Sequence, residues 1–518
     1  MKKIVALLLA LVMVFALVAC GNNEKPNTPS NPSTPGTSTP GSDAPTTPDA
    51  PEEPVINFDE DPYEVSIQFV GLFEQNTNIA NVEAALNAIT LEKINVTVDI
   101  VPVFIGELPS TISLGVAGDE KLDIVAIGLT YPMTAAVADE TIIPLDELLA
   151  ERGQGALAAT AHVAEAQKMN GATYGLTGYT YAAMGGGFVY NKTMADKYGI
   201  KMYDGMTIED LTAAAEILKQ NGVYLTTFGN SAELNYKFLN GGEHFGSNAP
   251  YGSILDANST EIINVYDSKE IRDYFKTVKS WAEAGYLPAD QLTDTTRVQE
   301  YFMGQMIFGT STAYTANQLG SWTSGEFEVG LVSTSPVGIS TASVQEFMLA
   351  IAANCERPDK AMDLINLIYT DPAVANLLQY GVEGTDYAFV DGSDCVITRE
   401  GTANADGNSY SATFVHYGKN SDLLVMAPLT ESFYADAEKL ESMAVKSPVF
   451  GYTFDSSEFG AEAGAISSIL QEKLPMLNAG VVADVDKAVD ELVAALEDAG
   501  INDIIAANQE QLNAYLGN

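Results

Sequence analysis

Side chains suited to covalent or metal chemistry are scarce in this chain. Its three histidines, His162, His244 and His416, have no spacing with cysteine that suits zinc. The glycine run at 185–187 lacks the lysine of a phosphate-binding loop, so we interpret it as a backbone kink. No spacing among the 69 acidic residues marks a pair for glycoside hydrolysis, and that activity stays open. We expect no metal ion and no cofactor, and we expect binding rather than catalysis.

Loops with aromatic and amide side chains are better suited to recognising a ligand. Aromatic rings offer apolar faces to the C–H surface of a sugar, and amides and carboxylates pair with its hydroxyl groups. Loops that follow strands and face helix N-termini add backbone N–H donors. The candidate binding residues are Phe73, Glu74, Thr130, Tyr131, Tyr179, Tyr181, Ser311, Tyr314, Asn317 and Trp322.

Three of these aromatic residues, Tyr131, Tyr181 and Trp322, are expected to form the platform for a sugar ring. The other tryptophan, Trp281, falls on an amphipathic stripe and is expected in the core. Ordinary packing is the alternative for each aromatic residue, because 24 tyrosines make aromatic content alone uninformative.

Alternating strand and helix patterns must position these loops. Strands are predicted at 65–71, 94–103, 122–128, 305–310, 328–333 and 344–353, and helices at 81–92, 207–220, 267–284 and 358–369. Such alternation indicates an α/β architecture with mainly parallel sheets. After residue 447 the patterns are helical only, at 484–499 and 503–516.

The N-terminus has the pattern of an export signal. Lys2 and Lys3 precede an apolar run at 4–19, which ends at Cys20. This pattern resembles the bacterial lipoprotein signal, in which the cysteine is lipidated and tethers the mature protein outside the cell. An uncleaved membrane helix is the alternative, although a span needs about 20 residues. Residues 21–60, rich in Pro, Ser and Thr, are predicted to be a disordered tether.

Composition limits the remaining possibilities. The formal net charge of −44 argues against nucleic acid and anionic lipid as partners. The length beyond the tether exceeds what one hydrophobic core usually supports, so two or more lobes are expected. The run at 404–408 lacks the spacing of an EF-hand calcium loop. Cys355 and Cys395 are left as either a pair or free thiols.

Several segments in order resemble one known family. They are 113–119 followed by 122–125, 143–148, 173–176 followed by 188–192, and 301–306. The chain is similar there to the extracellular solute-binding lipoproteins of ABC importers, in the maltodextrin-type group. Segments 354–362, 366–371, 380–387 and 447–454 resemble the LipO-type lipoproteins within it, and the last of these opens a domain of unknown function. The resemblance also implies that Cys355 is a free cysteine.

The resemblance implies a periplasmic-binding-protein-like type II fold with two lobes. We expect a first lobe at 63–175 and 303–337, and a second at 176–302 and 342–447. Residues 448–518 are expected to form a helical domain packed on the lobes.

The expected function is that of a monomeric, membrane-anchored extracellular receptor of an ABC importer. It would capture a sugar or oligosaccharide by hinge closure and present it to the membrane subunits of the transporter. A secreted glycan-active enzyme and a non-transport adhesin or structural lipoprotein remain the alternatives.

Overall fold

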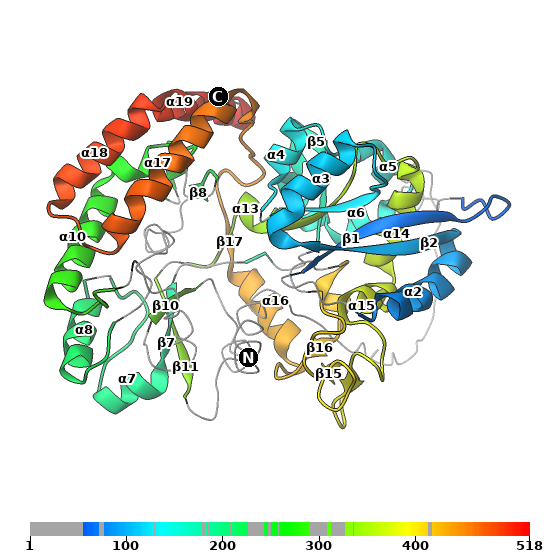
Figure 1. Cartoon of the computed structure of the whole chain (residues 1–518), viewed down its shortest axis with the longest axis horizontal. Coiled ribbons are helices and arrows are strands. Elements are labelled where there is room, and N and C mark those ends of the chain that lie inside the picture. The colour runs from blue at the N-terminus through cyan, green and yellow to red at the C-terminus, as the bar shows by residue number, and fades with distance from the viewer. Residues whose placement is uncertain are drawn as a thin grey trace, which may run out of the picture.

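Two lobes, each with its own hydrophobic core, make up the protein (Figure 1). The computed structural model describes residues 55–517, except 72–76, 129, 179–181, 184–186, 208, 226–242, 247–249, 257, 291, 293–307, 312–326, 335 and 413–416. Cys20 and the expected tether up to residue 54 therefore lie outside the described residues.

The first lobe is built on a five-stranded sheet in the order β2-β1-β3-β13-β6. The strands are β1 (Tyr63–Gly71), β2 (Val96–Phe104), β3 (Ile124–Gly128), β6 (Leu176–Thr177) and β13 (Phe347–Ile351). β1 runs parallel to both of its neighbours, while β13 runs antiparallel to β3 and β6. Every residue of β3 and β13 is buried, as expected for central strands covered on both faces.

Helices and short loop elements pack around this sheet. They are α2 (Ile79–Ile94), α3 (Leu108–Ala117), α4 (Met133–Ala138), α5 (Asp146–Glu151), α6 (Gln154–Ala159), α14 (Pro358–Thr370) and α15 (Pro372–Tyr380), with the hairpin of β4 (Lys168–Met169) and β5 (Ala172–Thr173). α15 also contributes to a small cluster beneath β14 (Ala388–Phe389), β15 (Val396–Thr398) and β16 (Val425–Met426). α16 (Phe433–Met443) packs on the other side of that sheet.

The expected placement of residues 342–447 in the second lobe was wrong. β13 completes the first sheet, and α14 and α15 bury their side chains in the first core. The cause is long-range strand pairing: β13 pairs with β3 from Phe347 opposite Gly128 to Ile351 opposite Ile124. Nothing in the local pattern of either strand identifies that partner.

The second lobe has a three-stranded antiparallel sheet in the order β10-β7-β11. Its elements include β7 (Gly187–Asn191), α7 (Lys192–Tyr198), α8 (Leu211–Gln220), β8 (Glu243–His244), β9 (Ser253–Ile254), α10 (Lys269–Ala284), β10 (Phe308–Ser311) and β11 (Val329–Ser333). The expected placement of 303–337 in the first lobe was therefore also wrong, because β10 and β11 both pair with β7. Val332 of β11 lies in the second core.

The C-terminal helices belong to the same second core. α17 (Gly460–Asn478), α18 (Val485–Asp498) and α19 (Ile501–Leu516) bury Ile466, Leu492 and Ile504 together with Trp281 and Phe275 of α10. Residues 448–517 thus complete the second lobe, and Figure 1 shows α17 and α18 running alongside α10.

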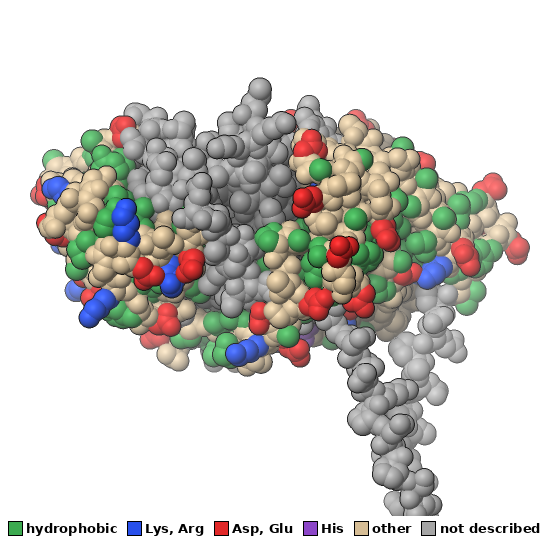
Figure 2. Space-filling model, turned by 90° about the horizontal axis from the view of Figure 1, so that it is seen from below, with side chains coloured by type: hydrophobic (Ala, Val, Ile, Leu, Met, Phe, Trp, Pro, Cys, Tyr) green, Lys and Arg blue, Asp and Glu red, His purple; other side chains and the backbone are tan. Residues whose placement is uncertain are grey.

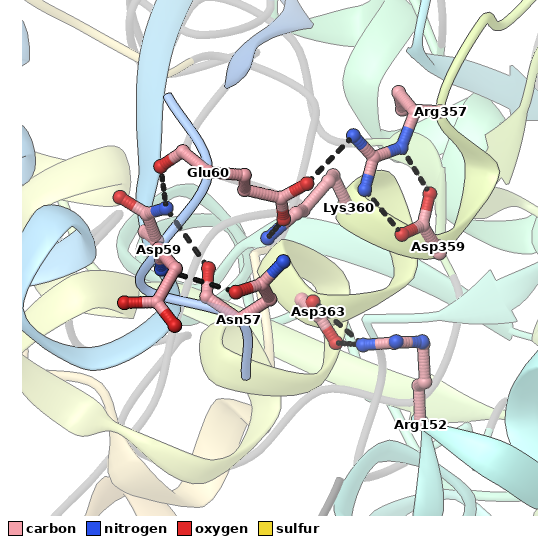
Figure 3. Close-up of polar contacts among 9 residues, drawn as sticks. Asn57, Asp59, Glu60, Arg152, Arg357, Asp359, Lys360 and Asp363 are labelled. Carbon is pink, nitrogen blue, oxygen red and sulfur yellow. Dashed lines mark hydrogen bonds and ion pairs between the residues drawn. The ribbon is translucent and has the colours of Figure 1, made fainter. Parts of the chain in front are cut away.

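The first described residues are fastened to the first lobe by ion pairs and hydrogen bonds (Figure 3). The Lys360 side chain is only 3% exposed and places Nζ 2.8 Å from Glu60 Oε1. Arg357 also contacts Glu60, at 3.4 Å, and pairs with Asp359. Asn95 donates hydrogen bonds to the backbone carbonyls of residues 57 and 60. We call the contacts of Glu60 with Arg357 and Lys360 the N-terminal clasp.

Cys355 and Cys395 are both free thiols. Cys355 Sγ lies 3.1 Å from Asp123 Oδ1, and Cys395 is buried in the small cluster with α16. Within the described part of the chain, none of the helices combines the length and apolar character needed to cross a bilayer.

Candidate functional site

The carboxyl edge of the first sheet is the expected position for a ligand site. β1 and β3 are parallel and end at Gly71 and Gly128, so the loops that follow them start at the same edge. Gly128 has a φ of 115°, and a Cβ there would lie 2.1 Å from the Glu346 carbonyl oxygen. Only glycine fits this turn, in which Gly128 and Tyr131 exchange two backbone hydrogen bonds.

That turn exposes Thr130 but buries Tyr131. Thr130 donates from Oγ1 to the Ile105 carbonyl at 2.8 Å. Tyr131 is 4% exposed, and its hydroxyl donates to Asp139 Oδ2 at 2.8 Å and lies 3.0 Å from Thr141 Oγ1. Burial raises the pKa of the Tyr131 hydroxyl. The expected platform role of Tyr131 is corrected: its ring packs in the first core and offers no free face.

The remaining candidate residues lie on the second lobe or outside the described residues. Ser311 ends β10 opposite Gly187 on the second lobe, and its side chain lies outside the described set. Because Thr130 belongs to the first lobe and Ser311 to the second, the candidates are divided between the lobes. Outside the described residues lie Phe73, Glu74, Tyr179, Tyr181, Tyr314, Asn317 and Trp322.

Three segments of the chain cross between the lobes. The first lies between β6 and β7, the second between β11 and β13, and the third between α16 and the C-terminal helices. The second and third crossings pair in parallel as β12 (Gly338–Ile339) and β17 (Val445–Lys446). Backbone bonds of 3.0 Å from Val445 to Val337 and from Ser447 to Ile339 extend this pairing.

A small apolar cluster joins all three crossings. Ala182 of the first crossing packs with Ile339 and Val344 of the second, and Ala444 of the third lies against them. Val344 belongs to α13 (Thr341–Val344), which has a capping box at Ser340. The paired strands and this cluster form the connection about which the lobes would move, and we call it the hinge.

Two glutamates, one half-buried and one buried, contact the hinge. Glu441 of α16 accepts a hydrogen bond from the Ala183 backbone at 2.8 Å, while burial raises its pKa. Glu243 of β8 is 7% exposed, and burial raises the pKa of its carboxyl to about 7, opposed by a hydrogen bond with Ser447. Neither residue could be identified from the sequence, because nothing local distinguishes a glutamate that becomes buried from the other acidic residues, 69 in all.

The described ranges contain no group of three His, Cys, Asp or Glu side chains arranged to hold a metal ion. The side chains described at the sheet edge and at the hinge are hydrogen-bonding and apolar groups. Groups of this kind are suited to holding a ligand by shape and hydrogen bonds.

Comparison with known protein families identifies this arrangement. Residues 84–385 match the family described as bacterial extracellular solute-binding protein. The chain belongs to that family. Residues 448–517 match a second family, described only as a domain of unknown function, DUF3502. In this solute-binding protein the second family corresponds to the helices that complete the second core.

Individual relatives of this solute-binding protein carry names that agree with the family match. A carbohydrate ABC transporter substrate-binding protein of Streptococcus pneumoniae is 25% identical over 475 residues, which cover 87% of this chain and 91% of the relative. The solved N-glycan transport solute-binding protein of Streptococcus pneumoniae has a TM-score of 0.74 at 21% identity, covering 88% of this chain and 99% of the other. An HMO-binding solute-binding protein of Bifidobacterium longum infantis has a TM-score of 0.63 at 16% identity, with coverage of 88% and 99%.

These likenesses confirm the type II periplasmic-binding-protein-like fold that the resemblance implied. The sheet of the first lobe fits the expected α/β class, whereas the antiparallel sheet of the second lobe was not foreseen. The solute-binding family membership likewise agrees with the expected class of function.

Proposed function

We propose that this protein is the receptor of an ABC importer and captures an oligosaccharide between its two lobes. The observation that carries the proposal is the similarity to the carbohydrate ABC transporter substrate-binding protein, which extends over 87% of the chain and includes both lobes. The hinge supports the same mechanism, because three crossings allow the lobes to close without breaking either core.

The receptor works by binding rather than by a covalent step. Ligand that contacts both lobes stabilises the closed arrangement, and the membrane subunits of the transporter recognise that state. We propose that Thr130 contributes from the first lobe and that the aromatic loops containing Tyr181 and Trp322 contribute the sugar platform. An acidic surface suits a soluble receptor and disfavours nucleic acid; Figure 2 shows Asp and Glu side chains scattered over one face.

The same proposal places the protein on the outer side of the cell membrane as a monomer. The support is the Lys2-Lys3 and apolar pattern that ends at Cys20, followed by a proline-rich segment. Lipid at Cys20 would hold the receptor near the transporter while its lobes remain in solution.

The test is a binding screen with the purified chain from residue 55 onward. The array of oligosaccharides includes Man1GlcNAc and Man5GlcNAc, the two glycans in solved complexes of the pneumococcal N-glycan transport protein. We expect at least one oligosaccharide to raise the melting temperature and to reduce the radius of gyration in small-angle scattering. Release of shorter sugars during the incubation would instead support an enzyme, and binding with an unchanged radius would contradict hinge closure.

A further inference from the structure

Glu243 occupies an unusual position beside the hinge. It begins β8, which pairs with β9 by placing Glu243 opposite Ile254 and His244 opposite Ser253. Because side chains alternate along a strand, Glu243 and His244 point in opposite directions. The Glu243 carboxyl reaches Ser447, the residue directly after the crossing strand β17. In Figure 1, β8 lies on the inner side of the second lobe, toward β17.

Among the described residues, Oε1 of this carboxyl is buried and has no hydrogen-bond partner. Interaction with the Ser447 side chain lowers the pKa of the carboxyl, against the larger effect of burial. Leaving a buried polar atom unpaired destabilises a protein, and it does so more strongly when the group is charged. Native proteins rarely retain such an atom without a function or a bound molecule that satisfies it.

Charged neighbours do not explain the burial of Glu243. His244 Nδ1 lies 2.9 Å from Ser253 Oγ, on the opposite side of the strand. Lys446 donates to the His162 carbonyl at 2.8 Å and lies over the Phe450 ring. Burial is the leading cause of the raised pKa, and no charged side chain in the described part of the chain contributes to it.

Ser447 fixes the direction of the carboxyl. Its backbone N–H donates to Ile339 of the paired crossing strand at 3.0 Å, and its Oγ accepts from the Val449 backbone at 3.3 Å. With these two bonds the hydroxyl can donate to Glu243, so the hinge itself orients the free Oε1. Ser447 is therefore a positioning residue.

We propose that Oε1 of Glu243 accepts a hydrogen bond from a hydroxyl group of the bound oligosaccharide, and so is a specificity-determining contact of the second lobe. This inference depends on the proposed function, since a sugar hydroxyl is the donor that it requires. A neutral hydroxyl satisfies the buried oxygen without introducing a second charge. A ligand lacking a hydroxyl at that position would leave the carboxyl unpaired and would bind more weakly.

The inference predicts a pH dependence with a definite sign. A ligand hydroxyl that donates to the carboxylate stabilises its ionised form, so the pKa of Glu243 is lower in the complex than its value of about 7 without ligand. Affinity should therefore increase as pH rises from 6 to 8. Glutamine at this position keeps the size of the side chain but cannot ionise, and its affinity should not follow this trend.

The experiment measures dissociation constants by calorimetry at pH 6, 7 and 8 for wild type, Glu243→Gln, Glu243→Ala and Ser447→Ala. The probe is an oligosaccharide of the array that binds wild type, beginning with Man1GlcNAc. We expect Glu243→Gln to bind about tenfold more weakly at pH 8, as for loss of a hydrogen bond to a charged group. Glu243→Ala should lose at least as much affinity. Ser447→Ala should keep the pH dependence with its midpoint moved to higher pH, because the bond that lowers the pKa is gone.

Matched controls distinguish a failure of this inference from a failure of the proposed function. Glu261→Gln, at an exposed acid of the same lobe, should bind as wild type at every pH. Melting temperatures without ligand check that each variant folds. If wild type binds a glycan and Glu243→Gln keeps the same affinity and pH profile, the inference is overturned and the proposed function stands. If wild type binds no oligosaccharide of the array, the proposed function fails and the inference fails with it.

Discussion

Trp281 shows how a single side chain connects two helices of the second lobe. Its ring is 4% exposed on α10, and its indole Nε1 donates to Thr212 Oγ1 of α8 at 2.8 Å. The stripe that the sequence predicted, formed by Ile271, Tyr274, Phe275, Val278 and Trp281, is buried in full. Periodicity identified these residues because a helix needs one apolar face wherever it packs.

Replacing Trp281 should therefore destabilise the protein without affecting the ligand site directly. Trp281→Ala removes a buried indole and leaves a cavity, at a cost of about 3–5 kcal/mol. Urea unfolding followed by circular dichroism measures this loss. Thr212→Val is the matched variant, since it removes only the acceptor for the indole and should cost about 1–3 kcal/mol. Equal stability of Trp281→Ala and wild type would show that the α8–α10 contact contributes little.

Replacing Trp322 is predicted to have the opposite effect to replacing Trp281. Trp322→Ala should weaken oligosaccharide binding and leave the melting temperature nearly unchanged, because a ring stacked on a sugar serves the ligand rather than the core. The measurement pairs calorimetric affinity with a thermal melt. In a Trp281→Phe background Trp322 is the sole tryptophan, and saturating ligand should change its fluorescence. Normal binding by Trp322→Ala would refute the assignment.

Tyr131 shows that the sequence did not predict the direction of a single side chain. It follows a strand at the correct edge of the sheet, yet its ring turns into the first core and its hydroxyl bonds to Asp139. Position in the sequence places a residue at an edge, but the direction of its side chain depends on the turn around Gly128. The burial of Glu243 could not be predicted for a related reason, since it arises from contacts between distant segments of the chain.

At the scale of elements, helices were easier to predict from sequence than sheets. The helix expected at 267–284 is α10, Lys269–Ala284, capped by Ser268. The predicted C-terminal helices at 484–499 and 503–516 correspond to α18 and α19. Helical bonds are local, so their signals lie within the segment. The partners of β10, β11 and β13 are set by pairing between distant parts of the chain, and the two errors in the lobe boundaries follow from that.

The turn after β3 provides a test at this scale. Gly128→Ala imposes both the left-handed φ and a collision with the Glu346 carbonyl, and should cost roughly 2–5 kcal/mol. Gly171→Ala is the matched control, because its φ is also positive, at 83°, but a Cβ there has no heavy atom within 4 Å. It should cost only about 1 kcal/mol. Differential scanning calorimetry compares them, and similar losses in both variants would contradict a steric requirement at Gly128.

For the whole molecule, each lobe is assembled from separate parts of the sequence. The first core combines residues before Thr177 with β13, α14 and α15, and the second combines the middle of the chain with the C-terminal helices. The number of lobes and the α/β class were predictable from length and alternating patterns. Which segments belong to which lobe was not predictable from the sequence, because it depends on which crossing each strand follows.

Membrane attachment is a further prediction for the whole molecule. Cys20→Ala removes the only thiol at the end of the signal-like run, so the protein should appear in the soluble fraction or remain as a longer precursor. Fractionation with immunoblotting measures this. Cys355→Ala is the matched control and should leave the membrane fraction unchanged. The idea fails if metabolic labelling with a fatty acid shows no incorporation into wild type.

The N-terminal clasp determines where a mechanical load would enter the receptor. Glu60 is paired with Lys360 and Arg357, at the start of α14 in the first lobe. Any tension transmitted along the chain from residue 54 therefore reaches the first lobe directly, and the three crossings carry it on to the second lobe. If the chain is anchored at its N-terminus, the first lobe serves as the stationary frame. The second lobe, with its C-terminal helices, then carries the whole displacement on closing.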